Sequence, residues 1–250
     1  MNTYKLIGHG PRKVICLHGW FGSASGWGPF VDVLDTEAFS YAFIDCRGYG
    51  DSQALRGDYS VAEIAADTLA LADQLGWQRF SLIGHSMGGM AIQQVLVESP
   101  ARVEKLVALT PVPANGYPFD DAGFAFFAGA ASSAEVRRHI IDKTTGNRLT
   151  GVWLDQIVRH SFDNSTREAF AAYLTSWAKS DFSSRVKGNP VHIKVIIGEH
   201  DPAINEALVG DTYLAWFPNV ELEIMANAGH YPMYETPVAL ATSVEQFLKA

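Results

Sequence analysis

A serine flanked by glycines stands where a strand pattern gives way to a helix pattern. In the stretch GHSMGG, residues 84–89, Ser86 has a glycine two positions before it and two positions after it. The apolar run FSLI precedes the stretch, and the helical pattern GGMAIQQVLVESP overlaps its end. This G-x-S-x-G spacing is typical of a nucleophile elbow, a turn so sharp that bulkier flanking residues would clash with nearby backbone. We therefore predict that the turn holds the hydroxyl of Ser86 out for nucleophilic attack.

A serine hydroxyl is a poor nucleophile unless a base takes its proton and a third group orients that base. Asp201 follows the strand-like run HIKVIIG, and His230 follows the next such run, VELEIM. Sites in an open parallel sheet form at the carboxyl ends of its strands, so all three side chains are expected to meet on one rim. We predict Ser86 as the nucleophile, His230 as the base and Asp201 as the acid that orients it.

Carboxylates elsewhere in the chain compete for the role of the acid. Glu199 and His200 lie beside Asp201, but successive side chains in a turn point in different directions. Asp120 and Asp121 follow the strand after the elbow, where a relocated acid could sit, although PFDDAG is typical of a solvated loop. Asp201 remains the preferred acid.

Other histidines compete for the role of the base. His85 precedes the nucleophile and is expected to point away from it along the turn. His139 and His160 lie in helical patterns and are expected to be surface or pocket residues. No pair of histidines has metal-ligand spacing with a third ligand nearby, so we assign no metal and no cofactor.

Acyl transfer also requires backbone N–H groups aimed at the developing oxyanion. One donor is expected from Met87, the residue after the nucleophile. The second is expected from the loop HGWFGS, residues 18–23, in which Gly19 permits a close approach. We choose the N–H of Trp20, with that of Phe21 as the next choice.

Short apolar runs alternate with helical patterns along the chain, and most runs are apolar throughout, as in strands covered on both faces of a parallel sheet. One helix begins after Ser60 with a capping box closed by Glu63. This alternation predicts an α/β fold with helices on both faces of a mostly parallel sheet. The strand-like runs are residues 14–18, 41–45, 80–84, 105–110, 192–198 and 220–225.

One segment departs from this alternation. From residue 113 to residue 187, helical patterns follow one another without a strand pattern. We predict a core formed by residues 1–112 and 188–250, with a helical cap inserted at 113–187. Aromatic side chains, mostly from this cap, are expected to wall an apolar substrate pocket. They are Phe21, Phe124, Phe127, Trp153 and Trp177.

The composition is that of an ordinary globular protein with a net charge of −8. A phosphate backbone or an anionic membrane would favour the opposite sign, so neither nucleic acid nor membrane is an expected partner. The first residues lack the apolar core of a secretory signal, and Cys16 and Cys46 are expected to be buried free thiols in a reducing compartment. We expect a cytoplasmic protein that acts on a small molecule, and the pattern favours no particular oligomeric state.

The motifs together resemble those of the α/β-hydrolase superfamily over nearly the whole chain. They are HGWFGSASGW (18–27), DCRGYGDS (45–52), GHSMGG (84–89), and the pair GEHD and AGHYP, in that order. The resemblance implies an eight-stranded, mostly parallel sheet with the cap after its sixth strand. The HGW and GHSMGG pairing is similar to that of small bacterial aryl esterases, perhydrolases and lactonases, in which residues matching Trp20 and Met87 supply the oxyanion hole.

The resemblance implies a serine hydrolase that cleaves a carboxylic ester, a lactone or a thioester of a small, fairly apolar substrate through an acyl-enzyme. The same triad also serves meta-cleavage C–C bond hydrolases and the lyase-like synthase of menaquinone biosynthesis, so this alternative stays open. Haloalkane dehalogenases and epoxide hydrolases carry aspartate where this chain has Ser86. Cofactor-free dioxygenases and hormone-receptor-like binding proteins share the fold, but the ordinary elbow with Met87 and the lack of extra tails favour neither.

Overall fold

A sheet of seven strands runs through the molecule in the computed structural model, which describes residues 2–250. The strand order is β1-β3-β2-β4-β5-β6-β7. β1 pairs antiparallel with β3, and every other neighbouring pair is parallel. The strands are β1 (Tyr4–Ile7), β2 (Arg12–Leu17), β3 (Phe39–Ile44), β4 (Phe80–His85), β5 (Val103–Leu109), β6 (His192–Gly198) and β7 (Val220–Met225).

The strand count corrects one expectation. Eight strands were predicted from the family resemblance, and this was wrong, because residues 2–250 form a sheet of seven. All strands except β1 lie at the apolar runs named from the sequence. β1 lacks such a run, because its side chains are exposed or half-buried at the edge of the sheet. The other segments of the described chain are helices, turns and loops, so no residues are left to extend the sheet.

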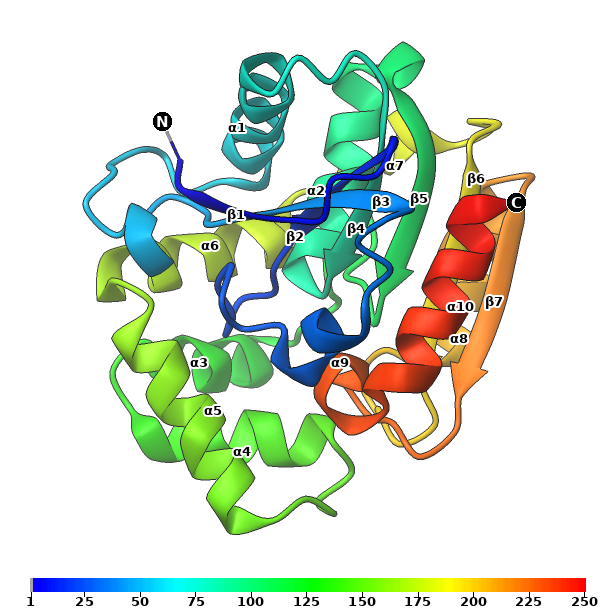
Figure 1. The fold of residues 1–250 in the computed structure, drawn as a ribbon. Helices are drawn as coiled ribbons and strands as arrows, with labels where there is room; N and C mark the ends of the chain where they lie inside the picture. Colours follow the sequence, from blue (N-terminus) through cyan, green and yellow to red (C-terminus); the bar gives the residue numbers. More distant parts are fainter. Residues whose placement is uncertain (1) are drawn as a thin grey trace.

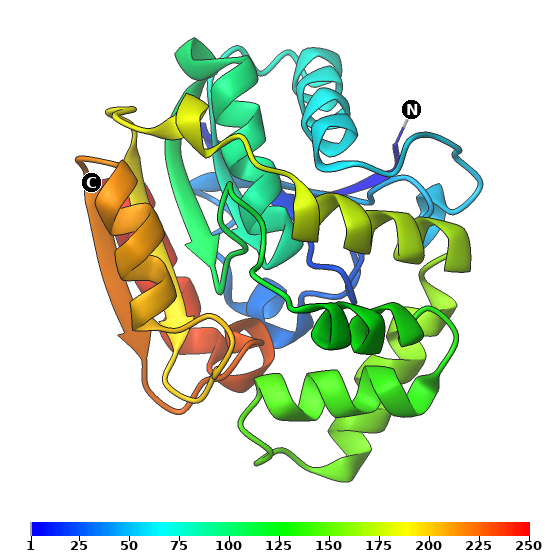
Figure 2. The ribbon, with the colours of Figure 1, turned by 180° about the vertical axis from the view of Figure 1, so that it is seen from behind.

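Helices cover both faces of the sheet, as predicted (Figures 1 and 2). On one face, the 3-10 helix η1 (Gly28–Val33) contacts α9 (Pro232–Glu235) and α10 (Pro237–Lys249). On the other face, α1 (Val61–Gln74) packs against α2 (Met87–Glu98). The α/β fold class is therefore confirmed.

The second face also carries α8 (Glu206–Val209), which continues into a π-helical turn. The side-chain amide of Gln93 in α2 donates a 2.7 Å hydrogen bond to the hydroxyl of Tyr213 in that turn. This buried contact joins α2 to the helical segment that precedes β7.

Capping explains where α1 begins. The hydroxyl of Ser60 accepts the N–H of Glu63 at 3.1 Å, as the capping box predicts. The carboxylate of Glu63 accepts the N–H groups of Asp58 and Tyr59 instead of that of Ser60. The box is therefore only half formed, and the carboxylate ties down the preceding turn.

Between β5 and β6 the described chain is helical, and we call residues 113–187 the cap. Its longer helices begin at Asp, Ser or Thr side chains that accept an N–H three residues later. In Figure 1 the arrowheads of β5 and β7 point toward α3, α4 and α5, so these three helices of the cap lie beyond the carboxyl ends of the strands. The cap helices are α3 (Asp121–Gly129), α4 (Ala134–Thr144), α5 (Gly151–Asp163), α6 (Arg167–Lys179) and α7 (Ser183–Val186).

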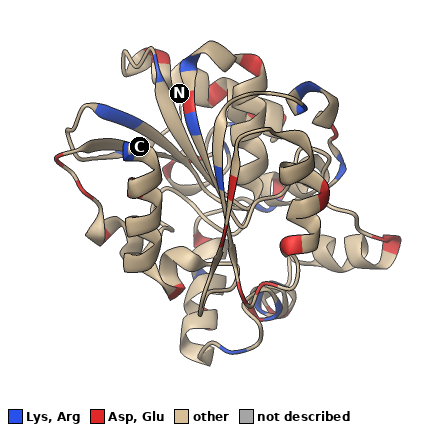
Figure 3. Ribbon diagram, turned by 90° about the vertical axis from the view of Figure 1, so that its right-hand side faces the viewer, with Lys and Arg blue, Asp and Glu red and all other residues tan. Residues whose placement is uncertain are grey.

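Within the described residues, no helix is long and apolar enough to cross a membrane. Lys and Arg positions are scattered over several elements rather than gathered on one (Figure 3). Cys16 and Cys46 are buried free thiols.

Candidate active site

The turn at Ser86 is strained in the way that an elbow requires. Ser86 joins β4 to α2 with φ +54° and ψ −114°, a conformation rare for a residue with a side chain. A Cβ on Gly84 would lie 2.2 Å from the carbonyl oxygen of Gly88, and a Cβ on Gly88 would lie 2.2 Å from that of Leu17. Both glycines are therefore required by space. The backbone N–H of Ser86 donates to Leu109 of β5 at 3.0 Å, which fixes the turn to the sheet.

Asp201 and His230 meet beyond the carboxyl ends of β6 and β7. His230 Nδ1 lies 2.6 Å from Asp201 Oδ2. The other carboxylate oxygen accepts the N–H groups of Ala203 at 2.9 Å and Ile204 at 3.2 Å. The Asp201 side chain is fully buried and that of His230 is 12% exposed. Because Nδ1 is engaged by the carboxylate, Nε2 is the ring nitrogen left for a reacting group.

Ser86 and His230 line one cavity of about 60 Å³, which we call the inner cavity. No hydrogen bond joins the Ser86 hydroxyl to His230 in the described chain. Such bonds are often long in a free enzyme and tighten only when substrate binds. The structure thus brings the predicted nucleophile, base and acid to one rim of the sheet.

A second carboxylate braces the loop that carries His230. Glu235 accepts the N–H of Gly229 at 2.8 Å and that of Tyr231 at 3.0 Å, the two residues on either side of His230. Arg148 of the cap donates to the same carboxylate, whose side chain is 2% exposed. Burial raises the pKa of Glu235, and the two N–H groups and Arg148 oppose that rise. This brace gave no recognised signal in the sequence.

Hydrogen bonds fix the backbone of His230. Its carbonyl oxygen accepts His85 Nε2 at 2.8 Å and the hydroxyl of Thr110 at 3.1 Å, and its N–H donates to the carbonyl of Thr144 in the cap at 3.1 Å. Burial lowers the pKa of His85 well below its usual value, so a neutral imidazole makes this bond. His85 was predicted to point away from Ser86, and its ring contacts the back of His230.

The Trp20 loop faces Ser86 from the side of β2. The carbonyl of Trp20 accepts the hydroxyl of Tyr49 at 2.9 Å, and its indole N–H donates to the carbonyl of Phe170 at 2.7 Å. The rings of Trp20 and Phe170 stack with centroids 4.1 Å apart. The backbone N–H groups of Trp20 and Met87 donate to no described residue, which leaves both groups available to an oxyanion.

His18 and Gly19 shape the start of this loop. His18 Nδ1 donates to the carbonyl of Gly19 at 2.8 Å, and its Nε2 accepts the N–H of Cys46 at 3.1 Å. A Cβ on Gly19 would lie 2.7 Å from His85 Nδ1 and 3.2 Å from the Cβ of Ser86. Only glycine therefore lets the loop come this close to the elbow.

A buried arginine joins the cap helices to the Trp20 loop. The guanidinium carbon of Arg137 lies 3.7 Å from the ring centroids of both Phe162 and Phe170. Its Nε donates to the carbonyl of Ala130 at 2.8 Å, and no carboxylate in the described chain pairs with it. Burial lowers the pKa of Arg137 to about 10. Phe170 thus lies between Arg137 and Trp20, so cap packing reaches the predicted oxyanion donor.

The inner cavity has walls of apolar and aromatic side chains. Of the predicted pocket residues, Phe21, Phe127 and Trp177 line it. No Lys, Arg, Asp or Glu among the described residues lines it. Several lining residues were not predicted, because they depend on how the cap packs on the core. These include Val112, Tyr117, Phe119, Ile140, Ile204 and Tyr231.

The other two predicted pocket residues lie elsewhere. Phe124 lines a separate surface cavity, where Lys179 Nζ lies 4.0 Å from its ring centroid. Trp153 packs edge-on against Tyr231 and Tyr234, with centroids 5.5 Å and 5.7 Å away. Aromatic spacing in the cap sequence does not reveal which helix face meets the core, and this is why both were misplaced.

The competing ionisable side chains are engaged in other contacts. Asp120 accepts the N–H of Gly123 as the N-cap of α3, and Glu199 accepts the N–H of Asn227. Within residues 2–250, no group of three or more His, Cys, Asp or Glu is placed to hold a metal ion. The remaining competitors hydrogen-bond to none of the triad side chains in the described chain: Asp121, His139, His160 and His200.

The Alpha/beta hydrolase family model matches residues 14–243, which include the elbow, the cap and the Asp201–His230 pair. The chain belongs to this family. As an α/β-hydrolase it is similar to a 2-hydroxy-6-oxononadienedioate/2-hydroxy-6-oxononatrienedioate hydrolase of Paraburkholderia xenovorans. The two are 28% identical over 98% of this chain and 89% of the relative.

Solved structures share the fold of this α/β-hydrolase. A bromoperoxidase from Bacillus anthracis matches with a TM-score of 0.88 at 21% identity, over 99% of this chain and 95% of the other. An esterase from Exiguobacterium antarcticum matches with a TM-score of 0.88 at 17% identity, over 100% and 96%. A meta-cleavage product hydrolase from Pseudomonas fluorescens matches with a TM-score of 0.82 at 18% identity, over 99% and 94%.

Proposed function

We propose that this α/β-hydrolase cleaves a carboxylic ester, or a related lactone or thioester, of a small and fairly apolar substrate through an acyl-enzyme. Ser86 is the nucleophile, His230 the base, and Asp201 the acid that orients it. Three observations support these roles: the strained elbow at Ser86, the 2.6 Å contact between Asp201 and His230, and the cavity that Ser86 and His230 share.

The proposed reaction has two halves, and His230 acts in each half first as a base and then as an acid. Ser86 Oγ attacks the acyl carbon while His230 Nε2 takes its proton, and the N–H groups of Trp20 and Met87 hold the oxyanion. His230 then protonates the leaving alcohol. Water then attacks the acyl carbon while His230 takes its proton, and His230 returns that proton to Ser86 Oγ as the acyl–serine bond breaks and the carboxylic acid leaves. The Asp201 carboxylate stabilises the imidazolium that forms in each half.

The observation that carries the ester proposal is that no Lys, Arg, Asp or Glu side chain of the described chain faces the substrate space beside Ser86. No described Lys, Arg, Asp or Glu lines the inner cavity. A carboxylate placed close to the scissile carbonyl would lose its hydration there without a cation to compensate. The cavity therefore favours a neutral acyl group next to Ser86.

A C–C bond hydrolase is the second candidate, because relatives such as that of Paraburkholderia xenovorans are named for a dienedioate substrate. The same Ser86 and His230 would serve, with His230 also moving a proton on a carbon of the substrate. A lyase-type reaction falls in the same class. The name dienedioate denotes two carboxylates, and the uncharged inner cavity offers neither of them a partner beside Ser86.

A panel of 4-nitrophenyl esters of increasing acyl length, run beside a 2-hydroxy-6-oxo-dienedioate, tests the proposal. We expect many turnovers with short esters, little consumption of the dienedioate, and loss of ester turnover in Ser86→Ala. Many turnovers would also exclude a ligand-receptor role. Consumption of the dienedioate without ester cleavage above the Ser86→Ala background would favour the second candidate and overturn the first.

A further inference from the structure

A larger cavity of about 470 Å³ adjoins the inner one beneath the cap, and we call it the outer cavity. The two cavities lie side by side, because six residues line both of them. The shared lining residues are Tyr117, Phe119, Phe127, Ile140, Thr144 and Ala203. The outer cavity is therefore the space beside the inner cavity into which the remote end of a longer substrate would reach.

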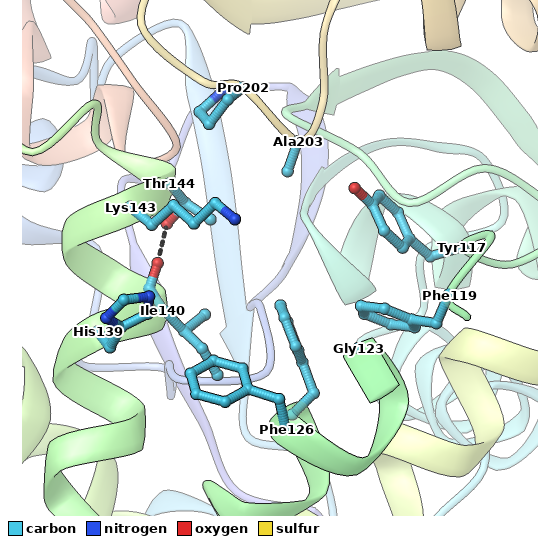
Figure 4. A pocket seen from close by; sticks show the side chains of 11 residues that line it. Tyr117, Phe119, Gly123, Phe126, His139, Ile140, Lys143, Thr144, Pro202 and Ala203 are labelled. Atoms are coloured by element: carbon cyan, nitrogen blue, oxygen red, sulfur yellow. Dashed lines mark hydrogen bonds between the residues drawn. The ribbon is translucent and has the colours of Figure 1, made fainter. Parts of the chain in front are cut away.

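Two basic side chains, those of Lys143 and His139, line the outer cavity. Lys143 is the one Lys or Arg among the described residues that line either cavity, and no described Asp or Glu lines them. Figure 4 shows its ammonium reaching into the cavity from the end of α4. The ammonium of Lys143 makes no hydrogen bond or ion pair in the described chain. Lys143 stands in the last turn of α4, where the partial charge of the helix favours a cation.

A hydroxyl faces Lys143 from the opposite wall. Figure 4 shows the hydroxyl of Tyr117 pointing into the same space. The hydroxyl has no hydrogen-bond partner in the part of the chain that the structure describes. Burial raises the pKa of Tyr117, so the group keeps its proton and is a donor. An ammonium and a hydroxyl that converge without an acceptor are suited to an anionic oxygen ligand.

We propose that the outer cavity binds a carboxylate at the remote end of the substrate, held by Lys143 and Tyr117. This inference rests on the proposed function and names its substrate class: esters in which an apolar spacer, on the acyl side or on the leaving-group side, separates the scissile carbonyl from a carboxylate. The spacer runs along Phe119, Phe127 and Ile140. A single cation matches a singly charged carboxylate better than a doubly charged phosphate.

Two matched pairs of esters test the site. The 4-nitrophenyl half-ester of adipic acid is compared with that of adipamic acid, and 4-acetoxybenzoate is compared with 4-acetoxybenzamide. In each pair, one ester carries a carboxylate where the other carries a neutral amide. This group lies on the acyl side in the first pair and on the leaving-group side in the second. We expect the carboxylate to be favoured in one pair by about fivefold to tenfold in kcat/KM, mainly through KM, as for one partly exposed charged contact. Added salt should shrink this ratio.

Substitutions test which residues cause the preference for a carboxylate over an amide. Lys143→Gln should reduce the carboxylate-to-amide ratio to about one, and Lys143→Glu should invert it. Tyr117→Phe should lower it by a smaller factor. Lys5→Gln removes the same charge from an exposed position on β1, outside both cavities, and should leave the ratio unchanged. Ratios near one in both pairs for the wild type, or a ratio that survives Lys143→Gln, would overturn the inference.

A binding measurement separates this inference from the ester proposal. If no ester in either pair is cleaved, the proposed function fails. Hexanoate and hexanamide are then titrated into the wild-type protein. Tighter binding of hexanoate that is lost in Lys143→Gln supports the carboxylate site, and equal binding of the two ligands overturns it.

Discussion

The two halves of the catalytic site are held by different kinds of interaction. Charged and directional hydrogen bonds fix the His230 half, with Asp201 on the ring and Glu235 on the flanking backbone. Aromatic packing dominates the Trp20 half, where Phe170 stacks on the indole and Arg137 stacks on Phe170. Directional bonds fail when one atom changes, whereas aromatic contacts weaken in proportion to the area removed. The base should therefore respond to substitution abruptly, and the oxyanion donor should respond gradually.

The largest effect is expected on the His230 half from Asp201→Asn. The amide keeps the shape of the side chain but favours the wrong tautomer of the imidazole, so kcat should fall by roughly 10³-fold to 10⁴-fold. Steady-state kinetics with a 4-nitrophenyl ester measures this, and circular dichroism checks the fold. A loss of less than about tenfold would show that Asp201 does not orient the base.

A graded response is expected on the Trp20 half. Phe170→Ala removes the ring between Trp20 and Arg137, and kcat should fall by roughly 10-fold to 100-fold, part of the cost of one oxyanion donor. The free energy of unfolding should fall by about 3–5 kcal/mol, as for other buried Phe→Ala changes. Chemical denaturation and ester kinetics measure both quantities. Phe170→Leu should lie between wild type and alanine, and an equal loss in the two variants would contradict a packing role.

A smaller effect is expected from Glu235→Gln. Each carboxylate oxygen accepts one N–H, from Gly229 or from Tyr231, and the substitution turns one of these oxygens into an NH2 group that cannot accept, so the His230 loop should loosen. We expect kcat to fall by about 5-fold to 20-fold, with KM nearly unchanged, because the change acts on the base and not on the pocket. Arg148→Gln should lower kcat less, since it leaves both N–H bonds intact. An unchanged kcat in Glu235→Gln would show that the brace is dispensable.

The smallest effect at neutral pH concerns stability. Burial lowers the pKa values of His18 and His85, whereas the unfolded chain has a histidine pKa of about 6.5. The unfolded state therefore binds more protons once the pH drops below about 6.5, and the folded state is destabilised there. The free energy of unfolding should fall by at most about 1.4 kcal/mol per pH unit for each histidine.

Denaturant titrations at several pH values between 7 and 5 measure that slope. His85→Gln should reduce it, because the glutamine amide can still donate to the carbonyl of His230 but does not take up a proton. An identical slope in this variant would show that the folded environment of His85 does not favour its neutral form.

The sequence predicted the features that local motifs determine and missed those that depend on tertiary packing. Ser86, Asp201 and His230 could be named because an elbow needs glycines and because parallel strands deliver their ends to one rim. β1 escaped notice because its half-exposed side chains form no apolar run. Phe124 and Trp153 were misplaced because the packing of one helix on another is a tertiary property that periodicity in the cap does not encode.

The brace around His230 was missed for a related reason. Glu235 and Arg148 meet only after the cap has docked, since they come from segments far apart in the chain. The Trp20 stack depends in the same way on Phe170 of α6. Local motifs therefore predict which atoms react, and tertiary packing decides how firmly they are held.

Labelling with a small alkyl fluorophosphonate tests the central claim, that Ser86 is the nucleophile of an ester hydrolase. Peptide mass mapping locates the adduct while ester turnover is followed in the same sample. The account predicts one adduct per chain, on Ser86, with turnover falling in step with labelling and no adduct in Ser86→Ala. An adduct on another residue, or turnover that persists in fully labelled protein, would contradict it.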